Sequence, residues 1–308
     1  MNTVLKNRVA IVTGAGGGLG RAHALALARC GARVVVNDLA GDRAGSAAQS
    51  VAREIQANGG VAMVNGGDVT DCAAMQAMVA SACQVWGRVD ILVNNAGILR
   101  DKSFAKLSLD DFRRVIEVHL MGAVNCTKAV WDRMRVQQYG RIVMTTSSSG
   151  LYGNFGQSNY GAAKMALVGL MQTLGLEGEK YGIRVNCLAP TAATAMTEGL
   201  MSESALAALR PEAVSPGLLA LVGEHAPTRA ILLAGAGSFE GAHITMTRGV
   251  YLGQGSDAAE QVHARFADIQ DRDGESVPHS AFEQAQLELT NAGIDAQILA
   301  SNPAAPQS

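Results

Sequence analysis

The stretch that decides the fold lies near the N-terminus and reads Arg8-Val9-Ala10-Ile11-Val12-Thr13-Gly14-Ala15-Gly16-Gly17-Gly18-Leu19-Gly20. Its first six residues form a short run that is mostly β-branched or apolar, which is typical of a buried parallel strand. Residues 21–29 then predict a helix that Gly31 ends. A strand, a glycine turn and a helix in this order favour phosphate binding, because the free N–H groups at the helix N-terminus attract anions. We therefore expect a dinucleotide site that includes Gly14, Gly18, Leu19 and Gly20.

The next predicted strand, residues 33–38, ends in an acidic residue, Asp38. A carboxylate about 20 residues after the glycines typically accepts a hydrogen bond from the adenosine ribose 2′-hydroxyl. The same charge repels the 2′-phosphate of NADP, and the glycine turn contains no Lys or Arg to attract it. The sequence therefore predicts NAD as the cofactor. Asp38 could instead serve only as the cap of the following helix.

A tyrosine and a lysine stand four residues apart in Ser158-Asn159-Tyr160-Gly161-Ala162-Ala163-Lys164. In a helix, both side chains lie on one face. A nearby ammonium favours the phenolate, so we expect the pKa of Tyr160 to fall below its usual value of about 10. Ser147 ends the predicted strand 141–145, where its hydroxyl could orient an alcohol or polarise a carbonyl. Ser147, Tyr160 and Lys164 thus predict a proton-transfer site.

Strands and helices alternate along the chain, which predicts an α/β fold with a single doubly wound parallel sheet. Further strands are expected at residues 61–64, 89–93, 183–188 and 230–237, and helices at residues 46–58, 73–86, 109–137 and 281–292. We expect a catalytic domain over residues 1–252. Residues 253–308 are expected to form a C-terminal extension that packs on the core, with frayed last residues.

Composition narrows the possible partners. The chain has 308 residues, 48% of them hydrophobic, with Lys+Arg 25 against Asp+Glu 27 and no basic stripe, so nucleic acid is not expected. Five scattered cysteines and six unclustered histidines predict neither disulfides nor a metal site. No apolar run reaches the roughly 20 residues of a membrane span, and the N-terminus lacks the apolar stretch of a signal peptide. The last residues, Pro306-Gln307-Ser308, differ from a peroxisomal signal, so a cytoplasmic protein is expected.

Four motifs in this order resemble the short-chain dehydrogenase/reductase family: TGAGGGLG at 13–20, NNAG at 94–97, Ser147, and Tyr160-x-x-x-Lys164. The resemblance implies a Rossmann-type domain in which Tyr160 is the acid/base and Ser147 orients the substrate oxygen. It also implies that Lys164 lowers the tyrosine pKa and holds the nicotinamide ribose. Further cofactor contacts are implied for Asp68 and Val69 at the adenine and for Asn95, Ala96 and Gly97 beside the cleft. From the residues alone, the amides of 94–97 could equally brace the sheet.

Longer matches resemble the (3R)-hydroxyacyl-CoA dehydrogenase module of peroxisomal multifunctional enzymes. They are VVVND at 34–38, NNAGILRDKSF at 94–104, YGRIVMTTSSSG at 139–150 and YGNFGQSNYGAAK at 152–164. This resemblance implies NAD-dependent oxidation of an acyl-CoA, and a homodimer or homotetramer built through the helices near 109–137 and 159–180. A hydroxysteroid or other secondary-alcohol dehydrogenase remains an alternative, because fold alone does not fix the substrate. A non-catalytic NAD-binding scaffold is a second alternative, against which Ser147, Tyr160 and Lys164 argue.

Two positions depart from the family pattern. His119 stands three residues before Gly122, where an asparagine is common, so the usual water-relay role of that position is in doubt. A lone histidine in such an apolar stretch is more often a buried, hydrogen-bonded residue. Thr191 follows Pro190 in place of the usual glycine, and the carboxamide contact is assigned to Thr194. The segment 191–215 is expected to be a substrate lid or a surface helix pair.

The loop after NNAG carries two cations, Arg100 and Lys102. It should lie at the carboxyl edge of the sheet, where ligands bind in such folds. We expect these cations to meet the phosphates of CoA, with Tyr152 and Phe155 beside the thioester. Exposed cations on a loop are often only solvated, which is the simpler alternative.

Overall fold

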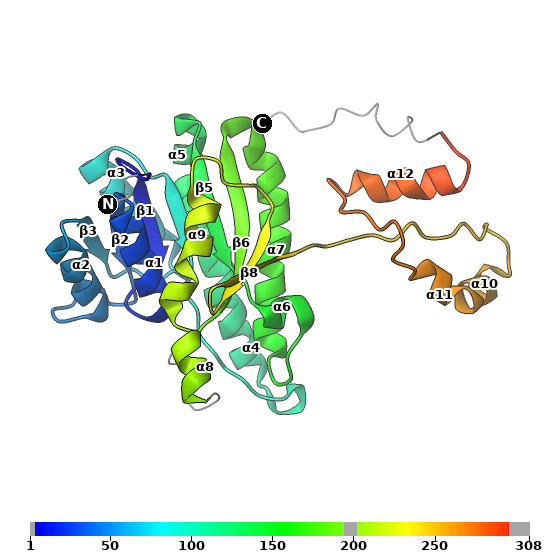
Figure 1. The fold of residues 1–308 in the computed structure, drawn as a ribbon, viewed down its shortest axis with the longest axis horizontal. Coiled ribbons are helices and arrows are strands. Elements are labelled where there is room, and N and C mark those ends of the chain that lie inside the picture. The colour runs from blue at the N-terminus through cyan, green and yellow to red at the C-terminus, as the bar shows by residue number, and fades with distance from the viewer. Residues whose placement is uncertain (1–3, 194–201, 296–308) are drawn as a thin grey trace. The chain divides into compact units, whose positions relative to one another are not determined.

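The computed structural model describes residues 4–193 and 202–295 of the chain (Figure 1). The chain divides between Ala242 and His243 into two compact units, and each is described by itself below. The predicted division at residue 252, with an extension that packs on the core, stays a prediction. Thr194, to which the carboxamide contact was assigned, lies outside the described residues, as do the methionines of the expected lid, Met196 and Met201.

The first unit is built on one eight-stranded sheet with the order β3-β2-β1-β4-β5-β6-β7-β8. Every neighbouring pair is parallel except β7 with β8. The predicted fold with a single doubly wound parallel sheet is therefore confirmed, apart from the antiparallel edge strand β8. The strands are β1 Val9–Thr13, β2 Arg33–Asn37, β3 Val61–Asn65, β4 Ile91–Asn94, β5 Gly140–Thr145, β6 Ile183–Thr191, β7 Ile231–Gly235 and β8 Ser238–Ala242.

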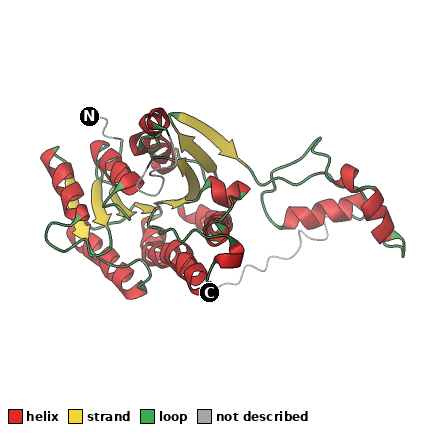
Figure 2. Ribbon diagram, turned by 90° about the horizontal axis from the view of Figure 1, so that it is seen from below, coloured by secondary structure: helices red, strands yellow, loops and turns green. Residues whose placement is uncertain are grey.

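Helices cover both faces of this sheet (Figure 2). On one face, Ala10 and Val12 of β1 belong to an apolar cluster that includes residues of α1 (Gly18–Arg29), α2 (Ala47–Ala57) and α9 (Ser215–Val222). On the other face, Val9 and Ile11 belong to a cluster with α3 (Cys72–Trp86), α5 (Gly122–Gln137) and α7 (Ser158–Gly178). Successive side chains of a strand point to opposite faces, so β1 contributes to two cores at once.

The far edge of the sheet differs from the expectation. The predicted strand 230–237 ends at Gly235, and the chain turns back through Ala236 and Gly237 into β8. Both turn residues have positive φ, 49° and 81°. Two consecutive positive φ values are the geometry of the tight hairpin turn whose twist matches that of the flanking strands. The last parallel strand is thus followed by an antiparallel edge strand.

The predicted helix 109–137 is also interrupted. It consists of α4 (Leu109–Ile116), a π-helical turn at Glu117–Met121 and then α5. In this turn the N–H of Gly122 donates to the carbonyl oxygen of Glu117, five residues earlier. Such a bulge adds one residue to a helical turn and is frequent at functional sites. It contains His119, which is buried.

The remaining elements are short. They are η1 (Phe104–Lys106), α6 (Ser148–Tyr152), η3 (Glu179–Tyr181), α8 (Glu203–Ala208) and η4 (Pro211–Ala213) in the first unit, and α10 (Ala258–Ala264), α11 (Phe266–Ile269) and α12 (Phe282–Asn291) in the second. Within the described ranges, no helix is long and apolar enough to cross a membrane. Among the same residues, no three His, Cys, Asp or Glu side chains are grouped to hold a metal.

Candidate active site

The glycine turn after β1 is packed so closely that side chains would not fit. A Cβ atom on Gly20 would lie 2.1 Å from the carbonyl oxygen of Gly14, and one on Gly14 would lie 2.9 Å from the Cα atom of Ala96. Gly14 and Gly18 also have positive φ, 62° and 49°. Helix α1 has no side-chain cap and no acid in its first turn. Its N-terminal N–H groups and dipole therefore suit a phosphate.

Asp38, which follows β2, lies against this turn. The N–H of Gly16 donates to its carboxylate, with a nitrogen-to-oxygen distance of 2.7 Å. The alternative that Asp38 caps the next helix is wrong, because Ser46 caps α2 by accepting a hydrogen bond from the N–H of Gln49. The carboxylate and the glycine turn, predicted separately from the sequence, are thus neighbours in the fold.

The amide of Asn95 braces the sheet. Its side chain donates to the carbonyl oxygens of Thr13 and Gly14, at 2.9 and 3.2 Å. The hydroxyl of Thr13 accepts from the N–H groups of Asn95 and Ala96, both at 3.0 Å. Gly97 packs against His119, whose Cε1 atom would lie 2.2 Å from a Cβ atom there. The segment 95–97 therefore ties the end of β4 to the glycine turn.

Asp68 and Val69 lie in the loop after β3. The Asp68 carboxylate accepts hydrogen bonds from the N–H and the hydroxyl of Thr70, each at 2.9 Å. The carbonyl oxygen of Val69 accepts from the side chain of Asn125, at 3.0 Å. These contacts hold the loop in one conformation and leave the carboxylate partly exposed, with a side-chain exposure of 35%.

Lys164 is almost completely buried and joins α7 to the end of β5. Its ammonium group donates to the carbonyl oxygen of Thr145 at 2.6 Å, and the hydroxyl of Thr146 donates to the Lys164 carbonyl oxygen at 2.6 Å. Burial lowers the pKa of Lys164 to about 7, because the charged form loses its hydration. Ser147 follows these threonines and brings its hydroxyl to Tyr160.

Tyr160 stands between these groups. The Lys164 nitrogen is 5.4 Å from the centre of its ring, and the side chain of Ser147 is near enough to lower its pKa. Our expectation that its pKa would be low is wrong for this structure. Burial raises the pKa of Tyr160, with Asp101 adding to the rise, and the side chain of Ser147 only partly opposes this. The expectation rested on a charged lysine, and burial disfavours that charge as well.

His119 packs edge-on against Tyr160, with ring centres 5.2 Å apart and planes at 89°. Its Nε2 atom lies 2.7 Å from the carbonyl oxygen and 3.0 Å from the N–H nitrogen of Ile98. Burial, and next the charge of Lys164, lower the pKa of His119 to about 3. The ring is therefore neutral at ordinary pH, and its contacts position Tyr160 and the chain at Ile98.

A small cavity of about 10 Å³ lies beside these residues. That is room for about one water molecule. His119 and Lys164 line it together with Thr13 and Asn94. The predicted catalytic and cofactor residues thus converge on the carboxyl ends of neighbouring strands.

The loop after NNAG shows contacts that sequence reasoning missed. Both Lys102 and Arg100 approach the carboxylate of Asp111 on α4, with nitrogen-to-oxygen distances of 3.0 and 3.8 Å. Tyr152 and Phe155, which we expected beside the thioester, are 67% and 91% exposed. Asp111 is separated from the cations by about ten residues, and no local pattern in the sequence indicates the pairing.

Comparison with known proteins identifies the family. The sequence model described as short chain dehydrogenase matches residues 8–205. A short-chain type dehydrogenase/reductase of Mycobacterium tuberculosis is 43% identical over 279 residues, which cover 89% of this chain and 97% of the relative. The peroxisomal multifunctional enzyme type 2 of Mus musculus is 50% identical over 222 residues, 70% of this chain and 30% of the relative. The chain therefore belongs to the short-chain dehydrogenase/reductase family, as its motifs predicted, and is an oxidoreductase of that family.

Solved structures agree. The full-length peroxisomal multifunctional enzyme type 2 of Drosophila melanogaster has a TM-score of 0.77 and 35% identity, covering 93% of this chain and 49% of that one. A 7α-hydroxysteroid dehydrogenase complexed with NADH has a TM-score of 0.70 and 30% identity, covering 77% and 96%. This chain spans about a third of the mouse relative and about half of the Drosophila structure.

The buried lysine predicts a pH-dependent stability. Between about pH 7 and pH 10, an unfolded lysine is charged while the buried Lys164 is largely neutral, so the unfolded state binds more protons. Stability from this group therefore rises with pH. Relative to Lys164→Met, the free energy of unfolding of the unmodified protein should rise by about 3 kcal/mol over this range, measured by urea unfolding without cofactor.

The exposed Lys106 supplies a control, because Lys106→Met removes a charge that no burial disfavours. Its pH profile should follow that of the unmodified protein. If the free energy of unfolding of Lys164→Met and of the unmodified protein changed with pH in parallel, the pKa of Lys164 would not be lowered by burial.

Proposed function

We propose that this chain is an NAD-dependent dehydrogenase that acts on the C3 hydroxyl of a (3R)-hydroxyacyl-CoA. The observation that carries the proposal is the convergence of Ser147, Tyr160 and Lys164 beside the glycine turn. Relatives named peroxisomal multifunctional enzyme or peroxisomal hydratase-dehydrogenase-epimerase support the substrate class. The proximity of Ser147 to Tyr160 and the buried lysine support catalysis over the alternative of a non-catalytic scaffold.

The residues present fit a dinucleotide. Gly14 and Gly20 allow the backbone to approach a pyrophosphate, the uncapped start of α1 offers N–H groups, and Asp38 offers a carboxylate to a ribose hydroxyl. Asp68 and Val69 would contact the adenine, and residues 95–97 would line the nicotinamide side. When bound, NAD supplies the hydride acceptor.

The side chains divide the proton chemistry among them. The Ser147 hydroxyl orients the substrate hydroxyl, and the Tyr160 oxygen takes its proton as the hydride leaves carbon 3. Lys164 holds the nicotinamide ribose and, when charged, stabilises the phenolate. His119 keeps the Tyr160 ring in place. In the reducing direction, Tyr160 returns the proton to the same oxygen.

Removal of the Tyr160 hydroxyl tests the catalytic role. Tyr160→Phe should lower kcat by about a hundredfold, the usual scale for a positioned acid or base. The affinity for NAD, measured by calorimetry, should survive, because no glycine-turn contact is lost. Tyr181→Phe, a change in η3 after the C-terminal end of α7, is the control and should leave kcat as it is. Full turnover in Tyr160→Phe would remove this residue from the mechanism.

The substrate class is decided by a panel assayed with NAD. It contains (3R)- and (3S)-hydroxyacyl-CoA thioesters, hydroxysteroids and simple secondary alcohols. The proposal requires the highest kcat/KM for a (3R)-hydroxyacyl-CoA. A hydroxysteroid as the best substrate would instead favour the second candidate, which the 30% identical 7α-hydroxysteroid dehydrogenase supports.

The choice of NAD over NADP is assigned to Asp38. Its carboxylate is held by Gly16 at 2.7 Å, where it would repel a 2′-phosphate. Asp38→Ser should shrink the ratio of kcat/KM for NAD to that for NADP by about tenfold, an electrostatic change of roughly 1.4 kcal/mol. Asp42→Ser removes an exposed acid four residues later and should leave the ratio unchanged. Equal kcat/KM for both cofactors in the unmodified protein would defeat the assignment.

We also propose a homodimer or homotetramer built through α5 and α7. These helices form a groove of about 210 Å³ whose walls include Trp131, Leu170 and Leu174. A second copy of the chain would fill this groove. Light scattering at micromolar concentration should give a dimer or tetramer mass, and Leu174→Glu should shift it toward the monomer. A monomeric mass for the unmodified protein would contradict the proposal.

A cytoplasmic location stays a prediction. Several relatives carry the word peroxisomal in their names, and fractionation of cells that contain this protein would separate the two locations.

A further inference from the structure

The loop that follows β4 is fixed at nearly every residue. Ile98 is held by His119, and the carbonyl oxygen of Arg100 accepts from the buried side chain of Asn159 at 3.0 Å. The carboxylate of Asp101 accepts from Gln157 at 2.7 Å, and the N–H of Lys102 donates to the carbonyl oxygen of Gly156 at 2.9 Å. A loop held by this many partners keeps the side chains that it presents in a defined place.

Two of its side chains share one counterion. Lys102 and Arg100 both point to the Asp111 carboxylate, and their side chains are 51% and 52% exposed. Lys102 donates to it directly, and these neighbours lower the pKa of Asp111. The three groups together carry a net charge of +1. Asp111 thus neutralises part of the positive charge of the two cations, and about half of each cationic side chain remains exposed to solvent.

The loop lies beside the proposed reaction site. Asn159, which holds it at Arg100, is the residue directly before Tyr160, and Asp101 is close enough to act electrostatically on Tyr160. The segment that carries the two cations is therefore attached to the residue next to Tyr160. A substrate bound at Tyr160 extends past them if its remainder leaves the site on this side.

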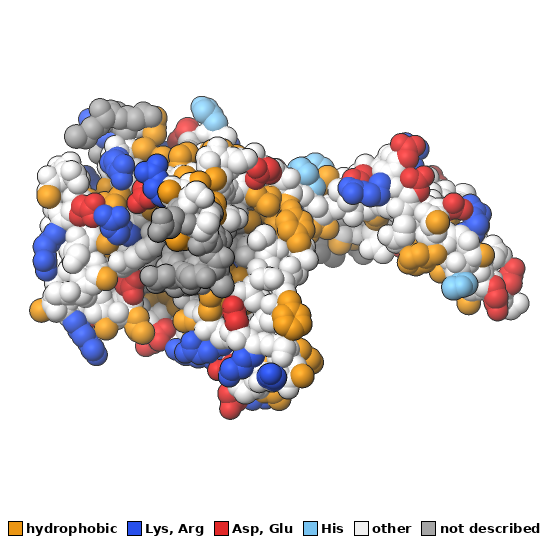
Figure 3. Space-filling model, turned by 60° about the horizontal axis from the view of Figure 1, so that its bottom comes forward, with side chains coloured by type: hydrophobic (Ala, Val, Ile, Leu, Met, Phe, Trp, Pro, Cys, Tyr) orange, Lys and Arg blue, Asp and Glu red, His pale blue; other side chains and the backbone are white. Residues whose placement is uncertain are grey.

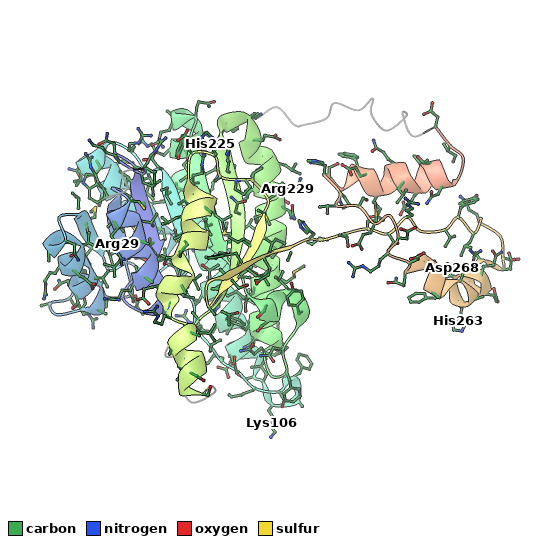
Figure 4. All side chains as sticks on the ribbon, in the orientation of Figure 1. Arg29, Lys106, His225, Arg229, His263 and Asp268 are labelled. Atoms are coloured by element: carbon green, nitrogen blue, oxygen red, sulfur yellow. The ribbon has the colours of Figure 1, made fainter. Side chains whose placement is uncertain are left out.

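Exposed aromatic side chains follow this loop or belong to residues 152–157, which bond to it through Gly156 and Gln157. Phe104, Tyr152 and Phe155 are 76%, 67% and 91% exposed. Exposed apolar side chains that gather with polar ones mark interaction sites. Figure 3 shows Lys and Arg side chains beside exposed hydrophobic side chains at the lower edge of the first unit. Figure 4 shows Lys106 at the outer tip of the segment between β4 and α4, pointing away from the sheet.

We propose that Arg100 and Lys102 bind the phosphates of the nucleotide part of the thioester, and that Asp111 is the internal counterion those phosphates compete with. The inference rests on the proposed function and adds its recognition step. The exposed aromatic side chains offer faces for the adenine base. A multiply charged phosphate group outcompetes a single carboxylate for two cations. Because the phosphates must displace Asp111, its carboxylate lowers the affinity of the loop for CoA.

The test compares a (3R)-hydroxyacyl-CoA with the matching pantetheine thioester, which lacks the nucleotide. Arg100→Ala with Lys102→Ala should raise KM for the CoA thioester about fivefold at low salt, and less at high salt. Asp111→Asn should lower the same KM about twofold. Both changes should leave KM for the pantetheine thioester unaltered. Free CoA titrated into the NAD-bound protein should follow the same order of affinity.

Matched controls exist on α4 and α5. Asp110→Asn removes the neighbouring acid, which is 93% exposed and pairs with Arg113 instead. Arg113→Ala with Arg133→Ala removes two cations elsewhere. Neither should change KM for the CoA thioester by more than the assay error.

The outcomes separate this inference from the proposed function. Turnover of both thioesters with equal responses to the variants would overturn the phosphate site while leaving the dehydrogenase intact. A KM that rises in Asp111→Asn would show that Asp111 orders the cations and does not compete with the ligand. Absence of turnover with either thioester would refute the proposed function itself.

Discussion

The burial of Lys164 is the constraint on which the rest of the site depends. Its ammonium group donates to the carbonyl oxygen of Thr145, and its own carbonyl oxygen accepts from the hydroxyl of Thr146. These two bonds fix α7 to the carboxyl end of β5. Because Tyr160 lies on α7 and Ser147 follows the end of β5, this junction also fixes the position of the two residues relative to each other. A buried lysine without such partners would be severely destabilising.

A second group of hydrogen bonds joins polar side chains to backbone groups around the Lys164 junction. Asn95 ties the end of β4 to the glycine turn, and Asp38 ties the end of β2 to the same turn. Asn159 then connects α7 to the loop after β4. These side chains join the ends of β2 and β4 and helix α7 at one edge of the sheet. Preorganisation of this kind is what positions groups for proton and hydride transfer.

Local sequence predicted the elements whose signals are local. The strand, turn and helix of residues 8–29 follow from β-branched residues and glycines, and the shared face of Tyr160 and Lys164 follows from their spacing. The pKa of Tyr160 was predicted in the wrong direction, since burial is a tertiary property that spacing does not reveal. The hairpin at Ala236 was missed because alanine rarely adopts the positive φ that it has there. Asp111 lies on α4, whereas its partners Arg100 and Lys102 lie on the preceding loop. Helical spacing therefore could not predict these ion pairs.

The π-helical turn at Glu117–Met121 has a consequence for how the chain can change in length. Each residue of a helix corresponds to about 100° of rotation. The extra residue therefore sets the phase between α4, which carries Asp111, and α5, which carries Trp131. Deleting one residue here would give a more regular helix and yet rotate one surface away from its partners. A surface loop that loses one residue can shorten without moving the elements that it connects. In this turn, the same deletion would rotate every side chain of the helix on one side of it.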